Sequence, residues 1–322
     1  MHTSELDRCC ASVLLALHLW IGPAVQAADA PPASFQEQLQ QQDGIYKSRG
    51  SAVPEGYVID RSLLSYTHTL PDDFNVSLAR LGPQERWLDI GAGEGRAIID
   101  YCTSKYDAMH AAVDPQDGKK GQAVAISIED RRTSQWHEAA AKLHPDQLRY
   151  LFGKTLSEYA PEELGRFHVI TDVMGGFSYS TDIAKFMQTT LSLLHTQGSF
   201  YTVLADVNSA TGGNKPHYPD SRYLTEIVAN DGSPVKMCSW LKRISCVEVT
   251  CEFKPDWTPP IEVYHVRKVC DAVTVPPLVP IHYQAGTPPE RGYRLRDAWV
   301  TEVRRAAEPE PTLATQGSGT AP

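Results

Sequence analysis

The stretch Trp87–Ile98, WLDIGAGEGRAI, constrains the fold of this chain more than any other. Three glycines, Gly91, Gly93 and Gly95, follow directly after a short apolar run. Glycine adopts backbone conformations that other residues avoid, so this spacing is typical of a tight turn between a strand and a helix. Such a turn brings bare backbone and a helix N-terminus close to a polar ligand. The stretch therefore predicts a strand at 86–91, a ligand-binding turn and then a helix.

Short apolar runs alternate with helical patterns from about residue 50 to residue 305, which predicts an α/β fold with a mainly parallel sheet covered by helices. The strands expected after the first lie within 122–130, 148–153, 167–180 and 199–207. Two further alternating runs, ISCVEVTCEF and IEVYHVRKV, predict a C-terminal antiparallel β-hairpin at the sheet edge. Nearer the N-terminus, FQEQLQQQ predicts a short helix.

Two classes of cofactor use a glycine turn of this kind. The dinucleotide fingerprint G-x-G-x-x-G needs a third small residue, and here that position is Arg96. Asp89 stands two residues before Gly91, which gives the pattern D-x-G-x-G-x-G. A carboxylate attracts the ammonium and sulfonium groups of S-adenosylmethionine and would repel a pyrophosphate. The pattern resembles motif I of the class I S-adenosylmethionine-dependent methyltransferases, and the resemblance covers most of residues 80–270.

The resemblance implies a Rossmann-like seven-stranded sheet with helices on both faces, S-adenosyl-L-methionine as the cofactor, and methyl transfer as the activity. It also implies which residues of the turn bind the cofactor. Asp89, Gly91 and Gly93 would surround its methionine part, and Ala92 and Gly95 would allow its close approach.

In the same family, an acid at the end of the second strand binds the ribose hydroxyls, and two residues are candidates here. Asp114 lies at the usual distance beyond the turn, whereas Glu129 follows the run VAISI. We prefer Glu129, because choosing Asp114 leaves a β-rich run with no place before the next helix. This choice makes 107–121 an insertion, and the alternative for Glu129 is a solvated helix-capping acid.

The loops after the third and fourth strands supply further candidates through the resemblance. Lys154, Thr155 and Leu156 stand where the family contacts the adenine. Asp172 stands where the family often has a polar residue facing cofactor and acceptor, and the alternative is an ordinary turn acid.

The acceptor is expected to bind at the carboxyl ends of the strands. The candidates there are Tyr66, His68, Phe177, Tyr179, Asp206, His217 and Tyr218. A histidine with an ordinary pKa near 6.5 suits a general base, but each of these side chains also fits a packing or surface role. Orientation of the reactants supplies most of the catalysis of methyl transfer, so no catalytic pair is named. The aromatic bias favours a small-molecule or protein-side-chain acceptor.

The formal charge of −9 and the pI of about 5.7 argue against a protein that binds nucleic acid by neutralising phosphates. An NPPY-like motif for amino methylation is absent after the fourth strand, where DVMGG stands instead. Nucleic acid is therefore an unlikely partner.

The N-terminal segment has the features of a secretory signal peptide. Ala11–Val25 is an apolar run of about 15 residues, shorter than the roughly 20 that a membrane span needs. Small residues then offer a cleavage site after Ala27, which favours export to the periplasm or medium. The alternative is an N-terminal helix packed on the domain of a cytoplasmic protein. The expected divisions are 1–27 signal peptide, 28–80 helical extension, 81–272 methyltransferase domain, and 273–322 extension with a disordered tail.

Cysteines concentrate near the C-terminal hairpin. Four of the seven are Cys238, Cys246, Cys251 and Cys270, which suits one or two disulfides or, equally, separate buried thiols. No Cys-x-x-Cys pair and no Cys/His spacing typical of zinc occurs, so no metal is expected.

Two other functions remain as alternatives. A non-catalytic cofactor-binding or interaction protein would keep the fold, and export would favour it because S-adenosylmethionine is made in the cytoplasm. A nicotinamide-dependent oxidoreductase is disfavoured by Arg96 and Asp89.

Overall fold

The computed structural model describes residues 33–47, 61–105, 120–204, 224–257, 261–286 and 288–296. The predicted signal peptide, Asp114, Asp206, His217, Tyr218 and the C-terminal tail lie outside these residues. Within them, no helix is both long and apolar enough to cross a membrane.

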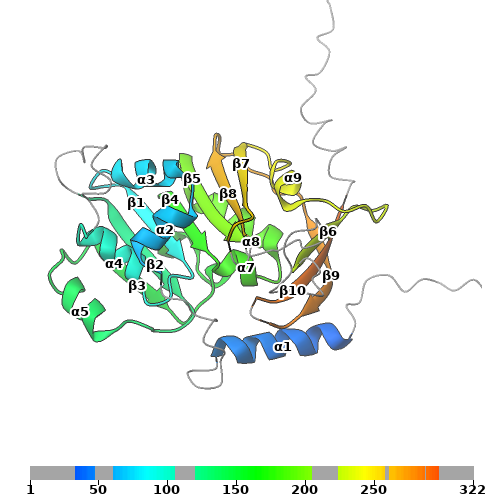
Figure 1. Ribbon diagram of the computed structural model, residues 1–322, viewed down its shortest axis with the longest axis horizontal. Helices are drawn as coiled ribbons and strands as arrows, with labels where there is room; N and C mark the ends of the chain where they lie inside the picture. The colour runs from blue at the N-terminus through cyan, green and yellow to red at the C-terminus, as the bar shows by residue number, and fades with distance from the viewer. Residues whose placement is uncertain are drawn as a thin grey trace, which may run out of the picture.

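Seven strands form the main sheet (Figure 1). They are β1 (Arg86–Ile90), β2 (Gln122–Ser127), β3 (Leu148–Phe152), β4 (Phe167–Val173), β5 (Leu194–Leu204), β7 (Val247–Lys254) and β8 (Ile261–Lys268). Their order is β3-β2-β1-β4-β5-β8-β7, parallel from β3 to β5, with β8 antiparallel to both of its neighbours. This sheet confirms the predicted α/β fold with its C-terminal hairpin.

The order of the strands reverses between β1 and β4. The chain continues from β1 through β2 to β3 on one side and from β4 to β5 on the other. In open sheets of this kind, ligands bind outside the carboxyl ends of the strands at the point of reversal. The loops after β1 and β4 are therefore the place to look for a site.

Helices cover both faces of the sheet, as predicted. One face packs against α2 (Leu63–Thr69), α3 (Asp72–Ala79), α4 (Arg96–Cys102) and α5 (Ser134–Ala140). Trp87 and Tyr201 project from this face and meet the ring of Phe74 edge-on, with ring centroids 6.2 and 5.4 Å away. The other face packs against η3 (Leu156–Glu158), α6 (Pro161–Leu164), α7 (Gly176–Tyr179), α8 (Ile183–Leu193) and α9 (Met237–Leu241).

A second sheet of three strands packs beside α7 and α8. It consists of β6 (Thr225–Val228), β9 (Leu278–Gln284) and β10 (Glu290–Leu295), with β10 in the centre. The helix expected from FQEQLQQQ is α1 (Ala33–Lys47), which lies along β9 (Figure 1). Gln38 and Gln42 accept hydrogen bonds from the backbone of Ala285 and Gly286, both at 2.9 Å. The sequence patterns had predicted neither β9 nor β10.

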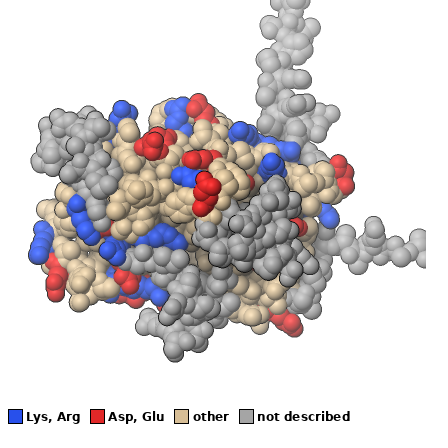
Figure 2. All heavy atoms as spheres, in the orientation of Figure 1, with Lys and Arg blue, Asp and Glu red and all other residues tan. Residues whose placement is uncertain are grey.

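Two disulfides crosslink the antiparallel end of the main sheet. Cys238 of α9 bonds to Cys251 of β7, and Cys246 bonds to Cys270 just beyond β8. The alternative of separate thiols is therefore wrong for these four, whereas Cys102 is a free buried thiol. Over the visible face of the described residues, Figure 2 shows basic and acidic side chains interspersed.

Candidate functional site

The turn after β1 has the shape that its glycines allow. Gly91, Gly93 and Gly95 have φ angles of 72°, 56° and 72°, a left-handed conformation that costs other residues about 1–2 kcal/mol each. A Cβ atom on Gly91 would lie 2.6 Å from the Cα of Gly175, in the turn after β4. The two turns thus touch at a point where only glycine fits.

The back of this turn rests on aromatic rings. A Cβ on Gly95 would lie 3.0 Å from Nε1 of Trp136 and 3.1 Å from the ring of Tyr150. The Tyr150 hydroxyl donates a short hydrogen bond to the carbonyl oxygen of Gly93 and lies 3.3 Å from that of Glu129. Tyr150 therefore joins the glycine turn to the segment after β2.

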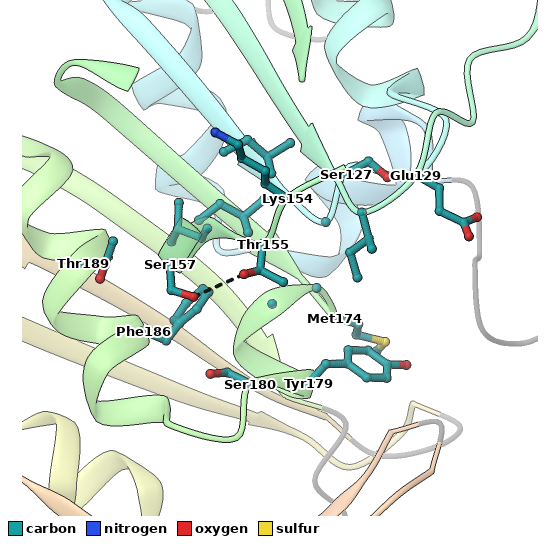
Figure 3. Close-up of a pocket in the computed structure, with 18 of the residues that line it drawn as sticks. Ser127, Glu129, Lys154, Thr155, Ser157, Met174, Tyr179, Ser180, Phe186 and Thr189 are labelled. Atoms are coloured by element: carbon teal, nitrogen blue, oxygen red, sulfur yellow. Dashed lines mark hydrogen bonds between the residues drawn. The ribbon is translucent and has the colours of Figure 1, made fainter. Parts of the chain in front are cut away.

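A cavity of about 410 Å³ opens where the strand order reverses (Figure 3). Its walls come from the turns after β1 and β4, the segments after β2 and β3, and the first half of α8. The described residues that line it include charged, polar and apolar side chains and the bare backbone of two glycines: Arg61, Gly91, Gly93, Glu129, Arg131, Thr155, Leu156, Met174, Tyr179, Asp182, Lys185 and Phe186.

The segment after β2 brings an acid to the cavity. β2 pairs in parallel with both β1 and β3, so the strand that precedes Glu129 lies where it was predicted. The Glu129 side chain is largely buried and forms a 3.0 Å ion pair with Arg131. Figure 3 shows Glu129 across the cavity from Thr189, with its carboxylate directed away from the other labelled side chains.

Asp89 differs from its predicted place. It does not line the cavity, because it projects from β1 on the same face as Trp87 and is fully buried there. Tyr66 donates to both of its oxygens at 3.0 Å, and Thr171 donates to Oδ1 at 2.7 Å. Burial raises the Asp89 pKa to about 7, against the opposing effect of these hydrogen bonds. The Asp89 carboxylate therefore links β1 to α2 and β4 through these hydrogen bonds, and it does not face the cavity as expected.

Asp172 occupies the matching place on the opposite face and also lies outside the cavity lining. Its carboxylate accepts hydrogen bonds from the backbone of Gly175 at 2.9 Å and Phe177 at 3.0 Å. Burial raises its pKa to about 7. The alternative of a turn acid is therefore the one observed, since both oxygens are occupied in holding the start of α7.

The segment after β3 also lines the cavity. Thr155 and Leu156 line the cavity, and Thr155 is fixed by Glu158, which accepts from its backbone at 2.6 Å and its hydroxyl at 2.8 Å. Lys154 also lines the cavity, but it is exposed and pairs with Glu163 at 3.4 Å.

Of the described acceptor candidates, only Tyr179 lines the cavity, and Figure 3 shows it beside Met174. Tyr66 is buried against Asp89, and Phe177 is part of the core. His68 is exposed at the end of α2 and absent from the cavity lining, so its expected place at the acceptor is not observed. His68 lies in the last turn of a short helix, on the side that faces solvent, so its imidazole does not reach the cavity.

Two wall residues had no sequence signal. Arg61 precedes α2 and donates to the Val173 carbonyl at 3.5 Å and to the Met174 sulfur at 3.2 Å. Met174 has a φ angle of 55°, unusual for a residue other than glycine. Both depend on contacts between segments far apart in the chain.

No protein-family model matches the sequence, and neither does any curated protein. Solved structures do resemble the fold. An rRNA methylase from Streptococcus thermophilus is 8% identical over 66% of this chain and 100% of its own, with a TM-score of 0.36. The plantazolicin methyltransferase BpumL, crystallised with S-adenosylhomocysteine (SAH), is 13% identical over 64% and 82%, with a TM-score of 0.39. YjhP from E. coli is 16% identical with a TM-score of 0.32, over 47% of this chain and only 56% of its own.

These likenesses are too distant to carry an argument about function. The assignment of the fold rests on this chain itself, on its strand order and its glycine turn. The fold is the Rossmann-like seven-stranded sheet with helices on both faces that the sequence resemblance implied.

Proposed function

We propose that the protein binds S-adenosylmethionine in this cavity and transfers its methyl group to a small molecule or a protein side chain. The observation that carries the proposal is the cavity of about 410 Å³, with Gly91 and Gly93 in one wall and Glu129 in another. Its place at the reversal of the strand order is where such sheets bind ligands.

The chemistry of the lining fits this cofactor. The bare backbone of Gly91 and Gly93 leaves room for the methionine part, and the Glu129 carboxylate is an acceptor suited to ribose hydroxyls. Thr155 and Leu156 offer a mixed polar and apolar wall to the adenine. When bound, S-adenosylmethionine supplies an electrophilic methyl group on its sulfonium.

The residues of this chain would contribute mainly by orientation. No histidine is among the described residues that line the cavity, and its acids are engaged: Glu129 pairs with Arg131, and Asp182 accepts from the backbone of Lys185 at 2.8 Å. A wall that holds the acceptor in line with the methyl group can supply about 7–11 kcal/mol of the barrier reduction without a proton transfer. Tyr179 is the described side chain best placed to contact the acceptor.

Calorimetry on the purified protein tests the proposal. We expect S-adenosylmethionine and SAH to bind and NADH not to bind. Incubation with hydroxyl, amine and thiol acceptors, followed by mass spectrometry, should then reveal a product heavier by one CH₂ unit. Absence of binding by both sulfur compounds would contradict the proposal.

The disulfides favour a second candidate, a cofactor-binding or interaction protein without turnover. Two crosslinks suit an oxidising compartment and support export, where a cytoplasmic methyl donor is scarce. Binding of SAH without transfer to any acceptor would favour this candidate. Sequencing of the mature N-terminus tests export: a start at Ala28 supports it, and an intact Met1 supports a cytoplasmic protein.

A further inference from the structure

One wall of the cavity is formed by the end of the four-residue helix α7 and by the short link that joins it to α8. The lining residues of this wall are Tyr179, which is the last residue of α7, and Ser180, Thr181 and Asp182, which join α7 to α8. A segment of this kind needs support from elsewhere to hold one conformation.

The support comes from β10 of the second sheet. Arg291 is only 1% exposed, and its guanidinium donates to the carbonyl oxygens of Phe177 at 2.9 Å and Ser180 at 2.6 Å. A third bond, 2.8 Å long, goes to the Thr225 hydroxyl on β6. Two residues along the strand, Tyr293 is also 1% exposed and donates to the carbonyl oxygen of Thr181 at 3.0 Å.

Arg291 is a buried cation that binds neutral oxygen atoms. Burial of a cation is costly unless an anion compensates it, yet every acceptor of Arg291 among the described residues is a neutral oxygen. Its Nε atom is buried and has no hydrogen-bond partner among the described residues. Burying an apolar side chain here would cost less free energy than burying a charged one. We therefore attribute the presence of the guanidinium to its hydrogen bonds with these carbonyl groups.

Asp172 and Arg291 hold the two ends of α7 through hydrogen bonds to its backbone. Asp172 accepts from the backbone N–H groups of Gly175 and Phe177 at the start of this turn, while Arg291 donates to the carbonyl groups at its end. Side chains from outside this four-residue helix therefore fix both of its ends.

We propose that Arg291 is a positioning residue, through which the second sheet fixes the wall formed by residues 179–182 and so sets the fit of the ligand in the cavity. The inference rests on the proposed function for the identity of the ligand, but the rigidity of the wall is measurable without it.

The test compares Arg291→Met with Lys268→Met in the full chain. Lys268 is the control because it is 2% exposed and donates to the carbonyl oxygen of Leu194 at 2.9 Å, at the start of β5 and away from the cavity. Unlike Arg291, it also pairs with an acid, Asp271, at 3.2 Å. Each substitution removes a buried cation that binds backbone carbonyl oxygen. Hydrogen exchange over residues 175–182, SAH affinity by calorimetry, and urea unfolding are measured for both.

We expect Arg291→Met to speed exchange in residues 175–182 and to weaken SAH binding about tenfold. Lys268→Met should lower stability without either effect, and Arg291→Lys should recover part of the affinity because it keeps one donor and the charge. Unchanged exchange in Arg291→Met, or the same changes in both methionine variants, would overturn the inference. If the wild-type protein binds no SAH, the proposed function fails, and the exchange data still decide whether Arg291 positions the wall.

Discussion

The turns after β1 and β4 both line the cavity, but different interactions hold them in place. Each follows a buried aspartate near the end of its strand, Asp89 in β1 and Asp172 in β4, and each forms part of the cavity wall. The carboxylates project to opposite faces of the sheet. Asp89 is held by hydroxyl groups of Tyr66 and Thr171, whereas Asp172 binds backbone N–H groups of its own turn.

The difference concerns what shapes each turn. The turn after β1 takes its form from three left-handed glycines at alternate positions, so its shape is local. The turn after β4 is held by Asp172 at its start and by Arg291, 114 residues beyond Phe177, at its end. A turn that is shaped by its own residues can be predicted from a short sequence pattern, whereas a turn that is held by distant residues cannot.

The largest expected effect comes from the point where the two turns touch. Gly91→Ala would place a Cβ 2.6 Å from the Cα of Gly175 at a φ angle of 72°. We predict loss of SAH binding and a fall in unfolding free energy of about 3 kcal/mol, because strain and overpacking add. Calorimetry and urea unfolding measure the two effects.

Gly232→Ala is the matched control, since Gly232 has a φ angle of 83° and a methyl group there would meet nothing within 4 Å beyond its chain neighbours. It should show the strain alone, with SAH affinity retained. Equal losses in the two variants would mean that the contact between the turns is unimportant.

A smaller effect is expected at the end of β2. Glu129→Ala should weaken SAH binding about tenfold through loss of the ribose acceptor, an energy of about 1.4 kcal/mol. Asp130→Ala is the control, because Asp130 bonds to Arg132 at 2.8 Å and does not line the cavity. Unaltered affinity in Glu129→Ala would return Asp114 to consideration as the ribose ligand.

The two aspartates should differ when each is replaced by asparagine. In Asp172→Asn the amide could accept from only one of the two backbone N–H groups, so this change should cost about 1–3 kcal/mol of stability and weaken SAH binding slightly. Asp89→Asn should cost less, since the hydroxyls of Tyr66 and Thr171 can rotate to suit the amide. Equal costs in urea unfolding would contradict this comparison of the turns.

The same two variants test a dependence on pH. Both carboxyls have folded pKa values of about 7, above the ordinary 3.8, so the folded state retains protons that the unfolded state has lost. Stability therefore falls as pH rises from about 4 to 7 and the difference persists above that range. Either asparagine variant should flatten this slope in unfolding measured across the range. If both variants kept the wild-type slope of stability against pH, groups other than these two carboxyls would be responsible for it.

The smallest effect on binding is expected from the disulfides, which lie away from both turns. Replacing Cys238 and Cys251 with serine opens a loop with a sequence separation of 13 residues, which should cost about 3 kcal/mol of stability. SAH affinity at a temperature where the variant is folded should equal that of the wild type. A large loss of affinity would show that the antiparallel edge also shapes the cavity.

Much of the main sheet was predictable, because buried parallel strands and amphipathic helices leave periodic patterns. The run before Glu129 became β2, and the buried side chains of α8 recur at helical spacing. This helix ends at Leu193 because Leu194 already pairs with Phe167 in the sheet.

The site was predictable only where it is local. The spacing of Gly91 and Gly93 identified one wall, but the direction in which Asp89 points depends on which face α2 covers. The second sheet, Arg61 and Arg291 left no pattern, since their roles arise from contacts across more than a hundred residues.

The contact between Gly91 and Gly175 ties the two turns together in any future redesign. A side chain at either position collides with backbone: one at Gly91 meets the Cα of Gly175, and one at Gly175 would lie 2.5 Å from the carbonyl oxygen of Ile90. A library that randomises a single turn should thus recover glycine at both points. Variety in ligand choice has to enter through the side chains farther along each loop.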